Sequence, residues 1–215
     1  MIFMIGVHGG SFDPIHFGHI NPLIELSDLF EFEEIRLVPT NKSPVDKTFY
    51  SNIDHRFNMV SIIAASDTNN FVADNVEMNR DEISYTYKTI KILKKRLQRE
   101  DICLIMGLDV FLKLESWYNY IEILNEVRII VVNRPDNDIN NIKNMNFEIL
   151  DRITNNKIDF LRNEKKHIFL FESSSIDISS SQIRSKISQN ENLSGLLPGS
   201  ILSYIKRNKL YTDLY

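Results

Sequence analysis

The fold is decided by GGSFDPIHFGH, residues 9–19, together with the segments on either side of it. The short apolar run Ile2–His8 comes before this stretch and is typical of a buried strand. Phe17–Phe30 comes after it and carries its apolar residues at helical spacing. A second apolar run, Ile35–Val38, follows and ends at Pro39. A strand, a glycine-rich turn, a helix and a strand in this order predict a βαβ unit with parallel strands.

The rest of the chain repeats this alternation. Further strands are expected at Phe71–Ala73, Asp101–Met106, Arg128–Val132 and Ile168–Phe171. Further helices are expected at Asp54–Ala65, Thr86–Leu97, Gln182–Ile187 and Ile201–Lys206. The strands are continuous apolar runs, which indicates that both faces of the sheet are covered. We therefore predict an α/β fold with a doubly wound, mainly parallel sheet of the Rossmann-like kind.

The whole chain, residues 1–215, is predicted to form one domain, because its length suits one α/β domain and it contains no internal repeat. The C-terminal part, about residues 179–215, is expected to form a small helical subregion. Residues 135–166 are polar, rich in asparagine and poorly periodic. We expect this segment to be a surface excursion.

Composition excludes several classes of protein. A hydrophobic fraction of 43% and a charged fraction of 25% are ordinary for a globular chain. Neither a membrane-spanning run nor the basic start of a signal peptide is present in the sequence. The single cysteine, Cys103, excludes an internal disulfide and favours a reducing cytoplasm. The net charge of −4 argues against a protein that coats nucleic acid.

Glycine and histidine residues gather directly after the first predicted strand, where ligands bind in parallel sheets. Gly9 and Gly10 allow backbone amides to approach a phosphate closely. His16 and His19 are three positions apart, so on a helical turn they share one face. Two imidazoles at a helix start suit phosphoryl transfer, which needs hydrogen-bond donors around the phosphate. The alternative is a tight turn with one structural and one solvated histidine.

Residues 9–19 resemble the GGTFDPIHxGH signature of the nucleotidylyltransferase superfamily, and the chain is most similar to its bacterial nicotinate-mononucleotide adenylyltransferases. Six further matches to that family follow in order over nearly the whole chain. They are LVPTNKSPVDK at 37–47, DHR at 54–56, SYT at 84–86, GLD at 107–109 with WY at 117–118, NRP at 133–135 and ISSSQIR at 178–184. Val45 and Asp46 replace the second Pro and the His of the family's usual PPHK, and residues 81–83 lack a usual glycine.

The resemblance implies transfer of the adenylyl group of ATP to nicotinate mononucleotide, with nicotinate adenine dinucleotide and pyrophosphate as products. The mononucleotide phosphate is the nucleophile, so no enzyme nucleophile is implied. The implied cofactor is Mg²⁺, held mainly by ATP phosphates and water. The implied partners are the two small molecules, with neither nucleic acid nor a membrane. The sequence leaves open whether the chain forms a homo-oligomer.

The resemblance also implies a role for each matching residue. The implied catalytic residues are His16, His19, Lys47 and Arg184. The implied ATP-binding residues are Gly9, Gly10, Ser11, Phe12, His16, His19, Gly107, Asp109, Ser179, Ser180, Ser181 and Arg184. The implied mononucleotide-binding residues are Lys47, Tyr85, Thr86, Asp109, Trp117, Tyr118 and Arg134. Trp117 is the only tryptophan, and a pyridine ring favours an aromatic plane.

These residues also have purely structural interpretations. Lys47 is then a solvated loop residue and Trp117 a core residue. Asp109 and the serines at 179–181 are then helix caps. His55 and Arg56 then stabilise only a helix start and the neighbouring loop.

Three alternatives to the implied function remain open at the level of sequence. The first is another transferase of the same fold, acting on nicotinamide mononucleotide or phosphopantetheine, or transferring a cytidylyl group. The second is a non-catalytic nucleotide-binding module. The third is a class I tRNA-charging enzyme, which the length of 215 residues and the negative net charge disfavour.

Overall fold

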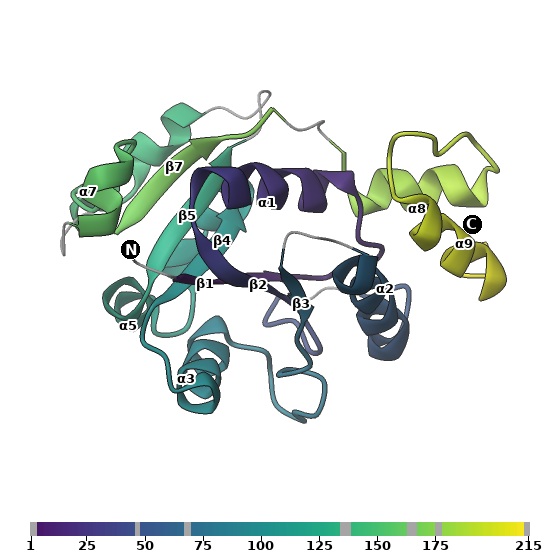
Figure 1. The fold of residues 1–215 in the computed structure, drawn as a ribbon, viewed down its shortest axis with the longest axis horizontal. Coiled ribbons are helices and arrows are strands. Elements are labelled where there is room, and N and C mark those ends of the chain that lie inside the picture. The colour runs from purple at the N-terminus through teal and green to yellow at the C-terminus, as the bar shows by residue number, and fades with distance from the viewer. Residues whose placement is uncertain are drawn as a thin grey trace.

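The computed structural model describes residues 4–45, 48–66, 70–133, 139–162, 167–174 and 178–212. Within them, seven strands form one sheet in the order β3-β2-β1-β4-β5-β7-β6, and each recorded strand pair is parallel (Figure 1). The strands are β1 (Met4–Gly10), β2 (Phe32–Pro39), β3 (Phe71–Ala73), β4 (Ile102–Gly107), β5 (Arg128–Asn133), β6 (Ile153–Thr154) and β7 (Ile168–Glu172).

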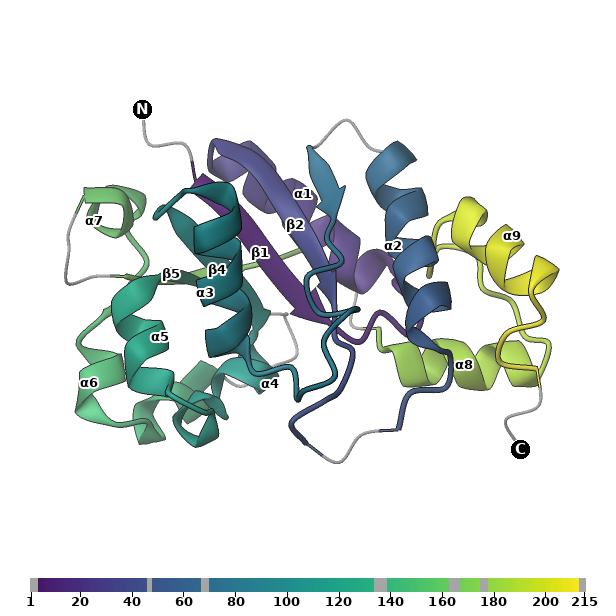
Figure 2. The same cartoon turned by 90° about the horizontal axis from the view of Figure 1, so that it is seen from below.

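Helices cover both faces of this sheet, with α1 on one face and α3 and α5 on the other (Figures 1 and 2). The α-helices are α1 (Phe17–Leu29), α2 (Ile53–Ser66), α3 (Thr86–Leu97), α4 (Leu108–Phe111), α5 (Tyr120–Glu126), α6 (Phe147–Leu150), α7 (Lys157–Arg162), α8 (Ser180–Ser188) and α9 (Gly199–Arg207). Two 3₁₀ helices are η1 (Leu114–Ser116) and η2 (Ile139–Asn144). The predicted doubly wound, mainly parallel α/β fold is therefore confirmed.

The core consists of two apolar clusters, one on each face of the sheet. The first cluster joins the sheet to α1, α2, α8 and α9, and the second joins it to α3, α5 and α6. Neighbouring residues of β4 enter different clusters, because successive side chains of a strand point to opposite faces. Cys103 and Ile105 belong to the first cluster, and Leu104 and Met106 to the second. Burial raises the pKa of the Cys103 thiol, so this cysteine behaves as a small core residue.

The strand order reverses between β1 and β4, since β2 continues the sheet on one side and β5 on the other. His8 of β1 lies in register with Ile105 of β4. In open α/β sheets a ligand binds beyond the carboxyl ends of the strands at such a reversal. The loops after Gly10 of β1 and Gly107 of β4 both start at this edge of the sheet, which is called the rim below. The fold thus places the 9–19 stretch at the expected binding position.

The C-terminal subregion continues the first cluster. Ile201 and Ile205 of α9 are buried there, and α9 lies beside α2 (Figure 2). Tyr211, after α9, is 5% exposed in the same cluster. Among the described residues, no helix has both the length and the apolar character that crossing a membrane requires.

Residues 139–162, the described part of the segment 135–166, lie mostly at the surface as expected, but they also contain regular elements and buried side chains. This part contains η2, α6, β6 and α7, and it places Ile149 and Phe160 at 0% exposure. The Phe160 ring lies 5.5 Å from the rings of Phe30 and Phe169, centroid to centroid. The elements are six residues long or shorter. A hydrophobic period needs a longer window, so the sequence pattern did not reveal them.

Replacing Phe160 tests whether this segment supports the fold. Phe160→Ala is expected to lower the free energy of unfolding by about 3–5 kcal/mol, because it removes a fully buried aromatic ring. Phe147→Ala is the matched control, since Phe147 lies in the same segment and is 80% exposed. That variant is expected to change the free energy by less than about 0.5 kcal/mol. Urea denaturation measures both, and equal losses would contradict the buried role of Phe160.

Candidate active site

The two histidines of the 9–19 stretch lie together at the start of α1. His16 is the N-cap residue of α1 and is 1% exposed, whereas His19 is partly exposed. Their ring centroids are 3.8 Å apart, and the Phe12 ring lies edge-on, 5.2 Å from the His19 ring. The carbonyl oxygen of His16 accepts a hydrogen bond from the backbone N–H of His19 at 2.9 Å. The structure thus confirms that the two imidazoles share one face of the helix start.

The turn before α1 is tightly packed. Phe12 has a φ of 48°, which is the left-handed region that bulky residues rarely adopt. Its side chain is 0% exposed, so Phe12 can offer a ligand only its backbone. Gly9, by contrast, is exposed, and no atom lies within 4 Å of the position that a Cβ would take. The turn therefore keeps open space beside the backbone at its beginning and buries the ring that follows.

The buried side chain of Arg56 contacts three segments: the loop after β1, the loop after β2 and the segment before α2. Its guanidinium donates hydrogen bonds to the carbonyl oxygens of Ser11 at 2.8 Å, Thr40 at 2.7 Å and Ser51 at 3.2 Å. The side chain is 1% exposed, and its guanidinium carbon lies 4.1 Å from the centroid of the Phe49 ring. Burial lowers the pKa of Arg56, and the charge of Asp13 opposes this effect. Arg56 thus fixes the loop after β1 against the loop after β2.

The carboxylate of Asp13 is the second buried junction. It accepts hydrogen bonds from the backbone N–H groups of Tyr50 at 2.7 Å and Ser51 at 3.2 Å. It also accepts from the hydroxyls of Ser51 at 2.8 Å and Tyr211 at 2.7 Å. Burial, followed by the nearby Asp13 charge, raises the pKa of the Tyr211 phenol, which therefore stays a donor at neutral pH. Asp13 thus connects the 9–19 stretch to the segment before α2 and to the C-terminal segment.

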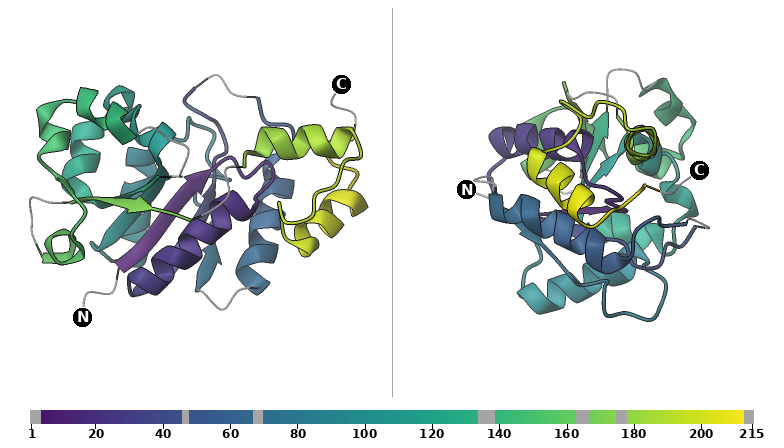
Figure 3. Two further views of the ribbon diagram at one scale, coloured as in Figure 1. Left: turned by 90° about the horizontal axis from the view of Figure 1, so that it is seen from above. Right: turned by 90° about the vertical axis from the view of Figure 1, so that its right-hand side faces the viewer.

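The serines before α8 lie against the 9–19 stretch. Ser179 caps α8, and its side chain and that of Gln182 form a reciprocal capping box. The Ser180 hydroxyl donates to the carbonyl oxygen of Pro14 at 3.0 Å. Ser179 is therefore a helix cap, as its structural interpretation predicted. Ser180 ties the start of α8 to the loop that carries the histidines. Figure 3 shows the first turn of α8 beside the chain segment that leads into α1.

Arg184 of α8 also reaches this loop. One of its terminal nitrogens donates to the carbonyl oxygen of Asp13 at 2.7 Å, and the other donates to the Ser181 hydroxyl at 3.1 Å. The starts of α1 and α8 are close, since a Cβ at Gly18 would lie 2.9 Å from a methyl carbon of Ile178. Neither helix has an acidic residue in its first turn. Two helix starts and a guanidinium therefore give this part of the rim a positive potential, which attracts phosphate.

The rim after β4 carries Asp109, which is exposed in the first turn of α4. A Cβ at Gly107 would lie 2.7 Å from the Asp109 carboxylate oxygen, so the Asp109 side chain lies directly over the Gly107 backbone. Gly107 and Asp109 are thus placed at the same reversal of strand order as the 9–19 stretch.

Two aromatic rings, those of Tyr85 and Tyr118, lie together at the start of α3. Tyr85 is the N-cap residue of α3, and its ring centroid lies 4.8 Å from that of Tyr118, which is 49% exposed. Thr86 is the first residue of α3 and is partly exposed. Trp117 is only partly exposed and packs against the second cluster, in keeping with its core interpretation. The structure therefore offers the Tyr85 and Tyr118 rings together at this position.

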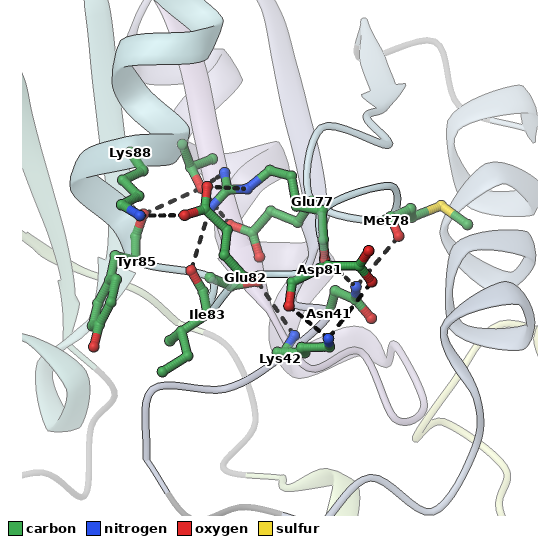
Figure 4. A network of polar contacts seen from close by, with 12 residues as sticks. Asn41, Lys42, Glu77, Met78, Asp81, Glu82, Ile83, Tyr85 and Lys88 are labelled. Carbon is green, nitrogen blue, oxygen red and sulfur yellow. Dashed lines mark hydrogen bonds and ion pairs between the residues drawn. The ribbon is translucent and has the colours of Figure 1, made fainter.

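A polar network fixes the segment before Tyr85, as Figure 4 shows. The Asn41 side-chain amide donates to the carbonyl oxygens of Met78 at 3.3 Å and Arg80 at 3.1 Å. The backbone N–H of Ser84 donates to the carbonyl oxygen of Lys42 at 2.8 Å, and the Ser84 hydroxyl accepts from the Lys42 backbone at 3.3 Å. The loop after β2 and the start of α3 are therefore held as one unit.

A buried trio extends this network beneath the loop. The Thr89 hydroxyl donates to the Glu77 carboxylate at 2.6 Å and accepts from Arg80 at 3.0 Å. Glu77 is 6% exposed and Thr89 is 3% exposed.

Sequence reasoning missed part of this site. Asp13 lies within the 9–19 stretch but has no role in the sequence interpretation. The interpretation that Arg56 stabilises the neighbouring loop is confirmed, but the sequence does not show that it also binds Ser11 and Thr40. Tyr50 and Tyr211 received no interpretation, because a single aromatic residue far along the chain carries no local signal. Two expected residues, Lys47 and Arg134, lie outside the described residues.

The comparisons with known proteins agree with this geometry. A sequence family described as cytidylyltransferase-like matches residues 7–186. A probable nicotinate-nucleotide adenylyltransferase of Methylococcus capsulatus is 30% identical over 208 residues, covering 97% of this chain and 99% of that protein. One of Vesicomyosocius okutanii is 34% identical over 202 residues, covering 94% and 93%.

A likeness in three dimensions extends over the same length. The solved structure of Plasmodium falciparum nicotinic acid mononucleotide adenylyltransferase complexed with NaAD aligns with a TM-score of 0.75. The alignment covers 98% of each chain at 22% sequence identity, so it concerns the fold alone.

Gly18→Ala tests whether the packing around His16 matters for the site. The new Cβ would lie 2.9 Å from Ile178 and 3.0 Å from the His16 ring, so the imidazole must move. A displacement of this kind is expected to lower the turnover of this chain with its nucleotide substrates about 10- to 100-fold. Gly199→Ala is the control, because a Cβ there meets no atom within 4 Å. Equal turnover for the two variants would contradict the importance of this packing.

Proposed function

The chain belongs to the cytidylyltransferase-like family, and from this premise we propose that it is a nicotinate-nucleotide adenylyltransferase. It transfers the adenylyl group of ATP to nicotinate mononucleotide in NAD biosynthesis. The observation that carries the proposal is its likeness, over nearly the full length, to relatives that bear this name. The loops that such a reaction needs meet at one rim of the sheet.

The phosphate half of the site is the rim between α1 and α8. We assign the ATP phosphates to the backbone of Gly9, Gly10, Ser11 and Phe12, to the imidazoles of His16 and His19, to Ser180 and Ser181 and to Arg184. Ser179 contributes through its position at the start of α8. Gly107 and Asp109 border ATP from the end of β4, and Asp109 accepts from a ribose hydroxyl.

The reaction is a single displacement at phosphorus. An oxygen of the mononucleotide 5′-phosphate forms a bond to the α-phosphorus of ATP, and the bond from that phosphorus to the bridging oxygen of pyrophosphate breaks. The attacking group is already an anion at neutral pH, so no protein nucleophile is required. The barrier is electrostatic, because two anions approach and negative charge grows on pyrophosphate. Donors held in fixed positions, such as His16, His19 and Arg184, lower it.

The mononucleotide half lies at the start of α3. The Tyr118 ring, together with Tyr85, offers an aromatic plane for the pyridine ring. Thr86 provides donors for its carboxylate, and Trp117 supports the platform from the second cluster. Roles for Lys47 above the phosphates and for Arg134 beside the mononucleotide stay predictions from the sequence.

Mg²⁺ is the proposed cofactor. Among the described residues, no group of three or more His, Cys, Asp and Glu side chains gathers to hold a metal ion. The side chains at the phosphate half are imidazoles, hydroxyls and a guanidinium, which suit phosphate oxygens. We therefore assign Mg²⁺ to the phosphates and water, an arrangement that this ion favours. When bound it neutralises part of the triphosphate charge.

Two further proposals concern the chain as a whole. Residues 1–215 act as one catalytic unit, since α9 shares the first cluster with α1 and α2. A cytoplasmic location is proposed from the single, buried cysteine.

Parallel assays with two mononucleotides test the function. With ATP and Mg²⁺, nicotinate mononucleotide is expected to give NaAD and pyrophosphate faster than nicotinamide mononucleotide gives its dinucleotide, because the site offers donors to a carboxylate. Product formation by chromatography measures both. A wide margin in favour of the amide would overturn the acid preference. Binding of ATP without pyrophosphate release from either mononucleotide would instead support a non-catalytic module.

His19→Ala tests the proposed electrostatic role. The variant is expected to lower turnover about 10²–10³-fold, as removal of one charge-stabilising donor usually does. The KM for ATP is expected to change far less, since His19 acts on charge that develops in the transition state. His167→Ala serves as the control. His167 directly precedes β7, so it lies at the amino ends of the strands, whereas the site lies at their carboxyl ends. Unchanged turnover of His19→Ala would remove this role.

A further inference from the structure

Two neighbouring aromatic residues before α2 each cover a guanidinium. The Phe49 ring lies 4.1 Å from the guanidinium carbon of Arg56, and the Tyr50 ring lies 4.1 Å from that of Arg184. These distances fall within the range in which a cation is attracted to the face of an aromatic ring. The two pairs differ in burial, because Arg56 is 1% exposed, whereas Tyr50 is 52% exposed.

Asp13 holds both members of the second pair. Its carboxylate accepts from the backbone N–H of Tyr50 at 2.7 Å, and its carbonyl oxygen accepts from Arg184 at 2.7 Å. Tyr211 and Ser51 fix the same carboxylate from other directions. The position of the Tyr50 ring relative to the Arg184 guanidinium is therefore set by a buried residue of the 9–19 stretch.

The guanidinium of Arg184 is thus covered on one face by the Tyr50 ring, and its two terminal nitrogens donate to Asp13 and Ser181. The contacts recorded for the described residues use two of the five N–H donors of its guanidinium. The others are left for phosphate oxygens, which a planar guanidinium binds in a fork. A ring on one face of the guanidinium limits the rotation of a long, flexible side chain. The Arg184 side chain consequently loses less conformational entropy when it binds an anion.

We propose that Tyr50 is a positioning residue that holds Arg184 in the orientation needed to bind the pyrophosphate part of ATP. This inference rests on the proposed function, which places Arg184 at the leaving group. A ring that is half exposed adds little to the core, so fold stability does not explain its place. Phe49 serves stability instead, because the guanidinium that it covers is buried.

The test compares Tyr50→Leu with Tyr50→Phe. Tyr50→Leu removes the ring face and is expected to raise the dissociation constant for inorganic pyrophosphate and the KM for ATP about two- to fivefold. The KM for nicotinate mononucleotide and the thermal unfolding midpoint are expected to stay unchanged. Tyr50→Phe keeps the ring face and is expected to match the wild-type chain. Calorimetry, initial rates and thermal unfolding supply these measurements.

Two controls separate positioning from stability. Phe147→Leu truncates another exposed aromatic residue, on α6, and is expected to change none of these quantities. Phe49→Leu is expected to lower the unfolding midpoint, because it uncovers a buried guanidinium. If Tyr50→Leu behaved like Phe49→Leu, with a lower midpoint and equal changes in both KM values, Tyr50 would be structural and the proposal would be overturned.

The remaining outcomes are also decisive. Pyrophosphate binding by Tyr50→Leu that equals wild-type binding overturns the proposal. A wild-type chain that binds pyrophosphate in a Tyr50-dependent manner but forms no dinucleotide supports it and overturns the proposed function. A wild-type chain that forms the dinucleotide but does not bind pyrophosphate overturns the proposal and leaves the proposed function in place.

Discussion

The site depends on one buried cation, Arg56. A guanidinium that is removed from water needs hydrogen-bond acceptors, and here the carbonyl oxygens of Ser11, Thr40 and Ser51 accept from its Nε and Nη1. Ser11 and Thr40 follow the paired strands β1 and β2, whereas Ser51 belongs to the segment before α2, which is not part of the sheet. A loop that moved would leave a buried charge without its partner, and such a loss is costly. The loops at the rim are therefore fixed before any ligand arrives.

Pre-organisation of this kind suits a reaction whose barrier is electrostatic. A donor that is already in place does not have to be reoriented while charge develops. The donors come from two parts of the fold: the turn after β1, which leads into α1, and the start of α8. Asp13 links the two, since its carboxylate and its carbonyl oxygen serve different partners. The C-terminal segment completes the arrangement through Tyr211, although it is almost two hundred positions away along the chain.

The two halves of the rim are stabilised by different means. The phosphate half relies on buried charges and helix starts, which create a positive potential. The mononucleotide half relies on a network in which Asn41 and Lys42 hold the segment before Tyr85, with the buried Glu77 carboxylate beneath it. A phosphate needs charge, whereas a flat ring needs a surface of fixed orientation.

The sequence by itself determined the alternation of strands and helices, the parallel sheet and the pairing of His16 with His19, because these depend on hydrophobic period and local spacing. It also placed the serines near 179–181 at a helix start. Only the tertiary structure decided which distant residues meet: Arg56 with three carbonyl oxygens, Tyr50 with Arg184, and Tyr211 with Asp13. It also decided that Phe160 is buried within a polar segment. Such contacts join segments through packing, and packing between distant segments leaves no period in the chain.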